Sequence, residues 1–262
     1  MTVFRSAGAA AGAAALLALL LLLPGLGAAP FDDPGEGQHA EIAREAWASG
    51  DWLTLRLGGV RYFDKPPLLY AMAAAAFAVW GPSEWAARLG PVIGAAAAVA
   101  ATAILGARLL GPGWGVLAGA ALLSSALFAF FGRYVRPETL FVAAIQWGLT
   151  GLLIGGVRDA GGLTRAASAR VWPLIGCAAL GLAALAKDPL GLLGPLAAVA
   201  GARWLGGRLR PLSSWLPAAG IVLALVLGFG WYALAGLRNP GFLWYTVVDN
   251  HVLNAARLRV FP

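Results

Sequence analysis

The fold is decided by residues 32–67, which read DDPGEGQHAEIAREAWASGDWLTLRLGGVRYFDKPP. This is the one long polar stretch in a chain that is 60% hydrophobic and 12% charged, and it holds seven of the twelve acidic residues. Soluble domains carry roughly 25% charged residues, so the rest of the chain is too apolar to cover itself with a water-exposed surface. We therefore expect an all-α, polytopic transmembrane helical bundle, with residues 30–84 forming a first polar loop outside the membrane.

Apolar runs of membrane-spanning length surround this loop. Residues 7–29 are nearly pure Ala, Leu and Gly, and their length predicts an uncleaved anchor, because a signal peptide has a shorter apolar core. Cleavage after Gly27-Ala28-Ala29 is the alternative. Six further segments bring the expected count to about seven spanning helices in a single domain over residues 1–262: 85–110, 113–132, 137–157, 171–187, 189–205 and 214–236.

The polar loop itself contains signals for two short amphipathic or interfacial helices. Ala40–Ser49 places apolar and charged side chains on opposite faces, and Gly50 is suited to end a helix. The alternation from Trp52 to Leu57 predicts an extended piece. Leu68–Trp80 follows two prolines and is too short to span, so we expect it to lie along the bilayer surface.

The distribution of charge predicts the orientation. With a cytoplasmic N-terminus, the inner segments hold one acid, Asp159, and eight basic residues, as the positive-inside rule expects: Arg5, Arg108, Arg158, Arg165, Arg170, Arg203, Arg208 and Arg210. The net charge of +7 is spread between apolar runs, which favours membrane orientation over nucleic-acid binding.

The outer side then receives the other eleven acids and both lysines. Surface salt bridges in a solvated loop are one explanation, although each contributes little stability. A transporter or permease is another, but it would place ionisable groups near the middle of the membrane. Because the charges gather at one end of the helices, we favour a site at the outer surface.

Three pieces of this loop, residues 33–45, 48–52 and 62–67, resemble the polytopic glycosyltransferases that use polyprenyl-phosphate sugars. That family includes the aminoarabinose transferase of lipid A modification and the more distant protein O-mannosyltransferases. The similarity continues in order through Glu84-x-x-Ala87-Arg88, Arg133-x-x-Arg136-Pro137-Glu138, Ala186-Lys187-Asp188 and Asp249-Asn250-His251.

The resemblance implies an enzyme of the bacterial inner membrane with periplasmic active-site loops. It would move a sugar from a polyprenyl-phosphate carrier to a lipid, glycan or protein acceptor. Inverting transfer needs a base for the acceptor and positive charge for the departing phosphate.

Residue type and resemblance together give two sets of candidates. The catalytic carboxylates are Glu36 and Glu138, with Asp33 in reserve. The phosphate ligands are Lys65 first, then Arg257, Arg133, Arg136 and Lys187. Each set has a plainer alternative: an acid at a helix start interacts favourably with the helix dipole, and a lysine at a helix end extends toward the membrane surface.

A divalent metal is the one cofactor that the residues indicate. Asp64 and His251 stand where the family has a carboxylate and a histidine near a metal, and this donor pair suits zinc. His39 stands where the family usually has an aromatic residue, so we expect it to pack. No glycine-rich phosphate loop follows a strand, so no nucleotide cofactor is expected.

Three features depart from the family pattern. Gly35 stands where the family has the aspartate that is its leading candidate for the catalytic carboxylate, and Glu138 stands where it has Asp. Family members also continue well beyond Pro262. The sequence therefore leaves two further interpretations, an N-terminal part completed by a second chain and a catalytically inactive fragment.

Overall fold

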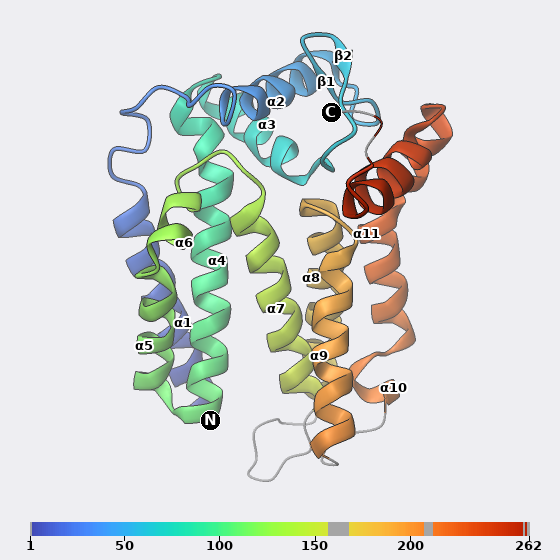
Figure 1. Cartoon of the computed structure of the whole chain (residues 1–262). Coiled ribbons are helices and arrows are strands. Elements are labelled where there is room, and N and C mark those ends of the chain that lie inside the picture. The colour runs from blue at the N-terminus through green and yellow to red at the C-terminus, as the bar shows by residue number, and fades with distance from the viewer. Residues whose placement is uncertain (1, 157–167, 207–211, 259, 261–262) are drawn as a thin grey trace.

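The computed structural model describes residues 2–156, 168–206, 212–258 and 260. Apart from one short hairpin, the ordered elements in these ranges are helices (Figure 1), which confirms the all-α prediction. Five residues used to predict the orientation lie outside the described ranges: Arg158, Asp159, Arg165, Arg208 and Arg210.

The long helices stand side by side as a bundle (Figure 1). In chain order they are α1 (Thr2–Leu22), α4 (Glu84–Leu110), α5 (Pro112–Leu123), α7 (Glu138–Gly156), α8 (Ser168–Ala186), α9 (Leu190–Gly206) and α11 (Ala218–Arg238). Of the described helices, α4, α7 and α11 are long and apolar enough to cross a membrane, while the others in the bundle are shorter apolar helices. A single turn, α10 (Leu212–Trp215), precedes α11.

Two expected spans differ in the structure: one is interrupted and the other ends early. The span predicted over 113–132 breaks after α5 and resumes as the short α6 (Ala126–Phe131), because Ser124 turns its hydroxyl onto the Ala121 carbonyl, 2.8 Å away, and competes with the helical hydrogen bonds. α1 ends at Leu22 rather than at residue 29, and Pro24 and Gly25, the latter at φ +65°, follow directly.

Small residues allow α7 and α8 to pack backbone against backbone. A Cβ added at Gly151 would lie 2.6 Å from both the Gly176 nitrogen and the Trp172 carbonyl oxygen. No side chain fits at that distance, so glycine is required there. Close packing through small residues is the usual way in which membrane helices associate.

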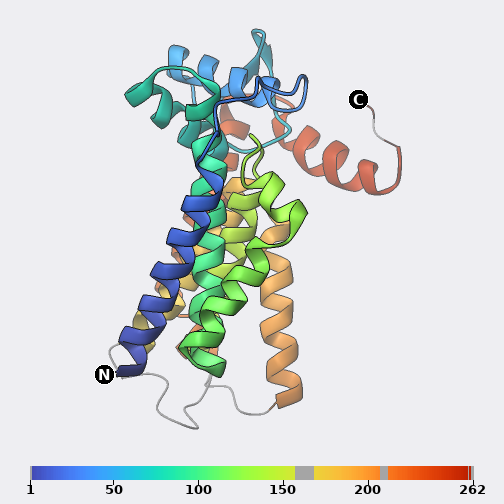
Figure 2. The same ribbon diagram turned by 90° about the vertical axis from the view of Figure 1, so that its left-hand side faces the viewer.

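The polar loop folds into a cap across one end of the bundle (Figures 1 and 2). It consists of α2 (Gly37–Ser49), the antiparallel strands β1 (Arg56–Leu57) and β2 (Val60–Arg61), and α3 (Leu68–Trp80). α3 has the predicted bounds, and α2 begins three residues early and ends at Gly50 with φ +68°, as predicted. The buried face of α2 around Ile42 packs on Tyr70 and Phe77 of α3.

The chain after α11 forms a helix that the sequence did not predict. This helix, η1 (Trp244–Leu253), has the wider π-type hydrogen-bond pattern. Trp244, Val247 and Val252 are exposed on it, whereas Thr246 and Asp249 are buried. It therefore has one apolar outer face and one polar inner face, which suits a helix lying at the membrane surface.

Candidate functional site

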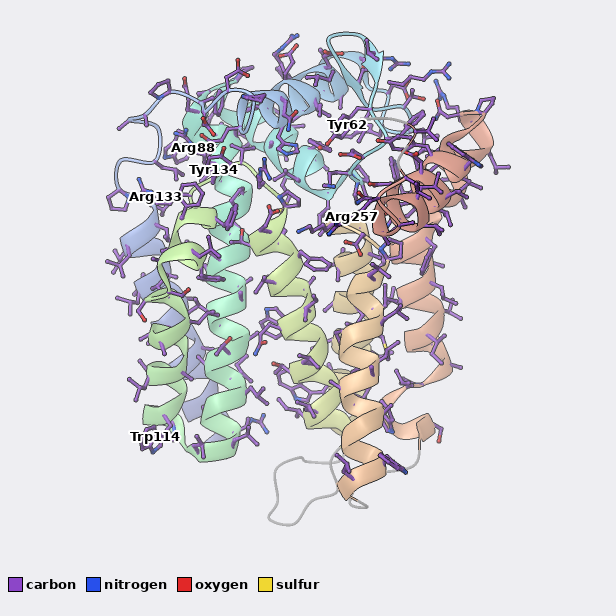
Figure 3. All side chains as sticks on the ribbon, viewed as in Figure 1. Tyr62, Arg88, Trp114, Arg133, Tyr134 and Arg257 are labelled. Atoms are coloured by element: carbon purple, nitrogen blue, oxygen red, sulfur yellow. The ribbon has the colours of Figure 1, made fainter. Side chains whose placement is uncertain are left out.

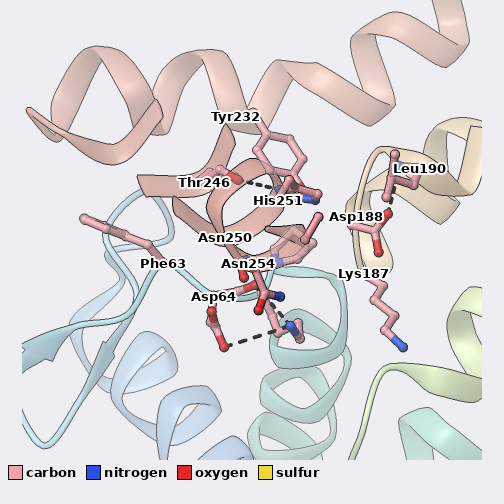
Figure 4. Close-up of a pocket in the computed structure, with 13 residues that line it drawn as sticks. Phe63, Asp64, Lys187, Asp188, Leu190, Tyr232, Thr246, Asn250, His251 and Asn254 are labelled. Carbon is pink, nitrogen blue, oxygen red and sulfur yellow. Dashed lines mark hydrogen bonds and ion pairs between the residues drawn. The ribbon is translucent and has the colours of Figure 1, made fainter. Parts of the chain in front are cut away.

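A pocket of about 340 Å³ opens where the cap, the α8–α9 junction, α11 and η1 meet (Figure 4). Four residues singled out in the sequence line it, and they come from three distant segments: Asp64 and Lys65 from the cap, Lys187 from the end of α8, and His251 from η1. The fold thus brings together residues separated by up to 187 positions along the chain.

The two lysines of the chain give this pocket its positive charge. Lys65 Nζ lies 4.0 Å from the Asp64 carboxylate, and 29% of its side chain is exposed. Lys187 Nζ lies 3.4 Å from Glu138 Oε1 and 5.7 Å from the centre of the Phe141 ring. Both ammonium groups remain partly open to solvent, so they can still receive an anion.

Glu138 does not line the pocket itself, but it contacts Lys187, which does. It is the first residue of α7 and follows Pro137, so it occupies the helix start that the sequence indicated. Its Oε1 accepts from Lys187, while Oε2 is buried and has no hydrogen-bond partner among the described residues. A buried oxygen without a partner is unfavourable in the absence of a ligand, and it leaves Glu138 able to accept a proton or a hydrogen bond.

η1 fixes the orientation of its histidine. His251 Nδ1 lies 2.5 Å from the Thr246 carbonyl oxygen, five residues earlier. Because a carbonyl oxygen only accepts, Nδ1 carries the proton, and in the neutral ring Nε2 is then an acceptor. Asp64 is fixed as well, since its Oδ1 accepts from the Tyr245 hydroxyl at 3.0 Å.

Asp64 and His251, together with the Asp188 carboxylate, are the side chains lining the pocket that have the right chemistry for a metal. Within the described ranges, no group of three or more His, Cys, Asp or Glu side chains is arranged to hold a metal ion. A zinc ion here would need its remaining ligands from water or substrate.

Glu36, the leading carboxylate candidate from the sequence, lies in a different environment. It is 2% exposed and forms a two-pronged ion pair with Arg88 of α4, with N–O distances of 2.9 and 2.5 Å. Its carboxylate also accepts from the main-chain nitrogens of Val135, at 2.9 Å, and Asp32, at 3.4 Å. With both oxygens occupied, Glu36 has no open face for a substrate, so the structure favours an anchoring role over that of a base.

Arg88 completes this anchor, which the sequence analysis did not assign. Besides Glu36 it donates to the carbonyl oxygens of Leu26, Ala29 and Pro30, at 2.8, 2.9 and 3.1 Å. It thereby ties the end of the α1 segment, the cap and α4 together. The sequence did contain a sign of this anchor, because Arg88 lies inside the apolar run 85–110 and a buried charge requires a partner.

Several other candidates lie outside the pocket. Arg133 donates to the carbonyl oxygens of Leu22 and Pro24, both at 2.8 Å, and so closes the end of α1. Asp33 is exposed at the start of α2, beside Gly37. Arg257 is exposed beyond η1, on the opposite side of the cap from Arg133 (Figure 3).

Arg136 is placed differently from these. Its guanidinium lies 5.9 Å from the centre of the Tyr134 ring, and its Nε is buried without a hydrogen-bond partner among the described residues. It acts electrostatically on His39, as does Lys65. A guanidinium with a buried free donor remains available to an anion.

His39 is buried, as the packing role expected for it requires. Its ring lies 5.8 Å from that of Tyr70, and Nδ1 is 3.0 Å from the Tyr70 hydroxyl. Burial, together with the positive charges of Arg136 and Lys65, lowers the pKa of His39 to about 4. The imidazole is therefore neutral at physiological pH, and burial likewise raises the pKa of the neighbouring Tyr62.

A second connection joins the cap to α11. Asn239 is 2% exposed; its Oδ1 accepts from the Thr54 hydroxyl and its Nδ2 donates to the Leu53 carbonyl oxygen, both at 3.1 Å. The Trp231 indole donates to the Trp52 carbonyl oxygen at 2.7 Å. Because Asn239 lies between α11 and η1, these bonds set where η1 crosses the pocket. Nothing in the local sequence pattern marks a partner 185 residues away.

Comparison with known proteins gives consistent matches. The profile of the dolichyl-phosphate-mannose-protein mannosyltransferase family matches residues 64–232, more than half of the chain. Two relatives, from Edwardsiella ictaluri and Pseudomonas paraeruginosa, are 28% identical over 224 and 220 residues, which is 84% of this chain and 39% of each relative. Both are named undecaprenyl phosphate-alpha-4-amino-4-deoxy-L-arabinose arabinosyl transferase.

Solved structures agree in fold. The crystal structure of ArnT from Cupriavidus metallidurans in the apo state superposes with a TM-score of 0.81 at 26% identity, over 90% of this chain and 43% of that one. The same protein bound to undecaprenyl phosphate also gives a TM-score of 0.81, over 91% of this chain. The chain thus spans about two fifths of the length of the relatives that it matches.

Proposed function

The chain belongs to the dolichyl-phosphate-mannose-protein mannosyltransferase family, and we propose on this basis that it is a membrane glycosyltransferase. It moves a sugar from a polyprenyl-phosphate carrier to a lipid, glycan or protein acceptor at the periplasmic surface of a bacterial inner membrane. The observation that supports this most is the pocket at one end of an apolar bundle that both Lys65 and Lys187 line.

This pocket suits the phosphate of a lipid carrier. An ammonium group is a compact positive charge that stabilises a departing phosphate, and two of them lie within one pocket. Apolar side chains are exposed on η1 and along α11, including Trp244, Val247 and Val226. A polyprenyl tail can therefore lie in the membrane while its phosphate enters the pocket from the side.

Glu138 acts on the acceptor, and the two lysines act on the departing phosphate. An acceptor atom forms the new bond to the anomeric carbon, and the bond from that carbon to the phosphate oxygen breaks. Lys65 and Lys187 stabilise the charge on the departing phosphate, and Glu138 orients the acceptor or takes its proton. Arg136, whose buried Nε has no hydrogen-bond partner among the described residues, is a further phosphate ligand, whereas Arg257 is a weaker candidate because it lies exposed beyond η1.

The relatives give the first donor to test. Their name specifies undecaprenyl phosphate carrying 4-amino-4-deoxy-L-arabinose, so this donor should be tried before mannose and other sugars. A second chain that completes the acceptor side is also part of the proposal.

Binding of a divalent metal is a separate proposal, because sugar transfer as described does not require one. Asp64 and His251 would each supply one ligand, and zinc would act there on a bound phosphate oxygen or water. Elemental analysis of the purified chain should show less than one metal ion per molecule after Asp64→Ala or His251→Ala, and an unchanged content would remove this proposal.

The direct experiment measures transfer of radiolabelled sugar in membranes that contain this chain, with Lys65→Met and Lys187→Met in parallel. Each substitution removes a charged contact to the phosphate, which contributes about 3 kcal/mol. The rate of transfer is therefore expected to fall about 100-fold. Glu41→Gln, which removes an exposed cap carboxylate, is the matched control and should change little. Transfer that survives both lysine substitutions would contradict the proposal.

A further inference from the structure

One carboxylate of the pocket has no partner of opposite charge. Of the described residues that line the pocket, four are charged: Lys65, Lys187, Asp64 and Asp188. Lys65 lies 4.0 Å from Asp64, and Lys187 lies 3.4 Å from Glu138, which is outside the lining. Asp188 forms no ion pair within the part of the chain that the structure describes. The pocket therefore holds one negative charge that its own lysines do not pair with.

The backbone fixes where this carboxylate lies. Asp188 stands between the end of α8 and the start of α9, and its Oδ1 accepts from the Leu190 main-chain nitrogen at 2.8 Å (Figure 4). This bond caps the first turn of α9. The side chain of Asp188 is partly exposed in the pocket, so its second oxygen, Oδ2, is accessible to a ligand.

The cap on α9 does not by itself explain the charge at this position. Asparagine caps a helix start as well as aspartate does, because the bond needs only a side-chain oxygen. The dipole of α9 favours an acid there, but only modestly. Removing a carboxylate from water is unfavourable unless the charge is paired. A ligand that fills this pocket and covers Asp188 should therefore supply a positive charge.

The rest of the lining suits a sugar. Asn250 and Asn254 contribute amide groups, which both donate hydrogen bonds to hydroxyl groups and accept them. The pocket volume of about 340 Å³ is small for a ligand site. A sugar whose phosphate lies at Lys65 and Lys187 is therefore expected to contact the lining that includes Asp188.

An ammonium group matches Asp188 better than a metal ion does. A primary ammonium has three donors and forms strong hydrogen bonds to a single carboxylate. Zinc usually takes three or four protein ligands, whereas no group of three or more His, Cys, Asp or Glu side chains within the described ranges is arranged to hold a metal. The chemistry that the unpaired carboxylate would recognise is thus an amine.

We propose that Asp188 binds a positively charged amine on the sugar of the donor and so selects an amino sugar over a neutral one. This inference rests on the proposed function and names the class of sugar that the pocket takes. The phosphate lies at Lys65 and Lys187, and the amine lies at Asp188 Oδ2. The carboxylate also keeps the amine protonated, because a nearby opposite charge favours the charged form.

The test compares two donors that differ in one group. Undecaprenyl phosphate carrying 4-amino-4-deoxy-L-arabinose is compared with the same carrier bearing L-arabinose, in which a hydroxyl replaces the amine. Binding of each to the purified chain is measured directly. The unaltered chain should bind the amino sugar at least about tenfold more tightly, since hydrogen bonds between charged groups are the stronger ones.

Two substitutions at one position separate charge from structure. Asp188→Asn keeps an oxygen that can cap α9 and loses the charge, so it should melt like the unaltered chain, bind undecaprenyl phosphate equally well and lose the preference for the amine. Asp188→Glu keeps the charge and should retain part of that preference. Glu41→Gln removes an exposed acid of the cap that does not line the pocket, and it should keep the full preference.

Each result has a defined meaning. Equal binding of the two donors by the unaltered chain, or a preference that Asp188→Asn retains, overturns the inference and leaves the proposed function intact. Absence of sugar transfer by the folded chain overturns the proposed function, while the preference in binding is still measured. Failure of both donors to bind overturns the two together.

Discussion

The buried ion pair between Glu36 and Arg88 provides the sharpest test of how the cap is held. Their side chains are 3% and 6% exposed, and Arg88 donates five hydrogen bonds, two to Glu36 and three to carbonyl oxygens. Removing one partner leaves the other charge buried and unpaired, which costs about 3–5 kcal/mol. For a chain of this size each kcal/mol corresponds to roughly 2–4 °C, so Glu36→Gln and Arg88→Met should each lower the melting temperature by about 10 °C.

The control pair is close by in the same cap. Glu41 and Arg44 also form a two-pronged ion pair, but their side chains are 38% and 48% exposed. Solvent screening reduces such a pair to less than about 0.5 kcal/mol, so Arg44→Met should shift the melting temperature by only 1–2 °C, by roughly the same conversion.

The assay is thermal unfolding in detergent, followed by intrinsic tryptophan fluorescence, together with transfer activity well below the melting temperature. Glu36→Gln should unfold early but retain transfer per folded molecule. A Glu36→Gln variant with normal thermal stability and no transfer would refute the anchoring role and restore Glu36 as the base. Equal shifts for Arg88→Met and Arg44→Met would refute the burial argument.

Three further predictions concern stability. Gly151→Leu should prevent normal folding, because its Cβ would lie 2.6 Å from α8 backbone atoms; size-exclusion chromatography should show aggregation, and a monodisperse variant would contradict the packing. Asn239→Ala leaves the Thr54 hydroxyl and the Leu53 carbonyl without their partner, so unfolding should become easier by about 2 kcal/mol, which denaturant titration measures. The pKa of His39 is lowered from 6.5 to about 4 by burial, so the unfolded chain binds the extra proton first; stability is full above pH 6.5 and falls by up to about 3 kcal/mol toward pH 4. His39→Phe should remove this pH dependence.

The sequence predicted the parts of the fold that depend on local pattern. Runs of apolar residues located the bundle, and the bounds of Leu68–Trp80, which follows two prolines, were predicted to the residue. The break between α5 and α6 was missed, because two serines in an apolar run carry a weak local signal.

The sequence could predict candidate site residues from their chemical type, but not the contacts that they make in the folded chain. Both lysines, which residue type marked as candidate phosphate ligands, line one pocket. The surroundings of Glu36 could not be predicted, because whether a carboxylate is free depends on partners 52 and 99 residues away. The connection through Asn239 was overlooked for the same reason: its partners come from a distant segment that only the folded chain brings close.

The most direct measurement is the affinity of the chain for undecaprenyl phosphate, compared with that of its Lys65→Met variant. The chain should bind the phosphate form at least tenfold more tightly than undecaprenol, which lacks the phosphate, and Lys65→Met should abolish that preference. Equal binding of the phosphate and the alcohol by the unaltered chain would contradict the claim that this pocket receives the phosphate of a lipid carrier.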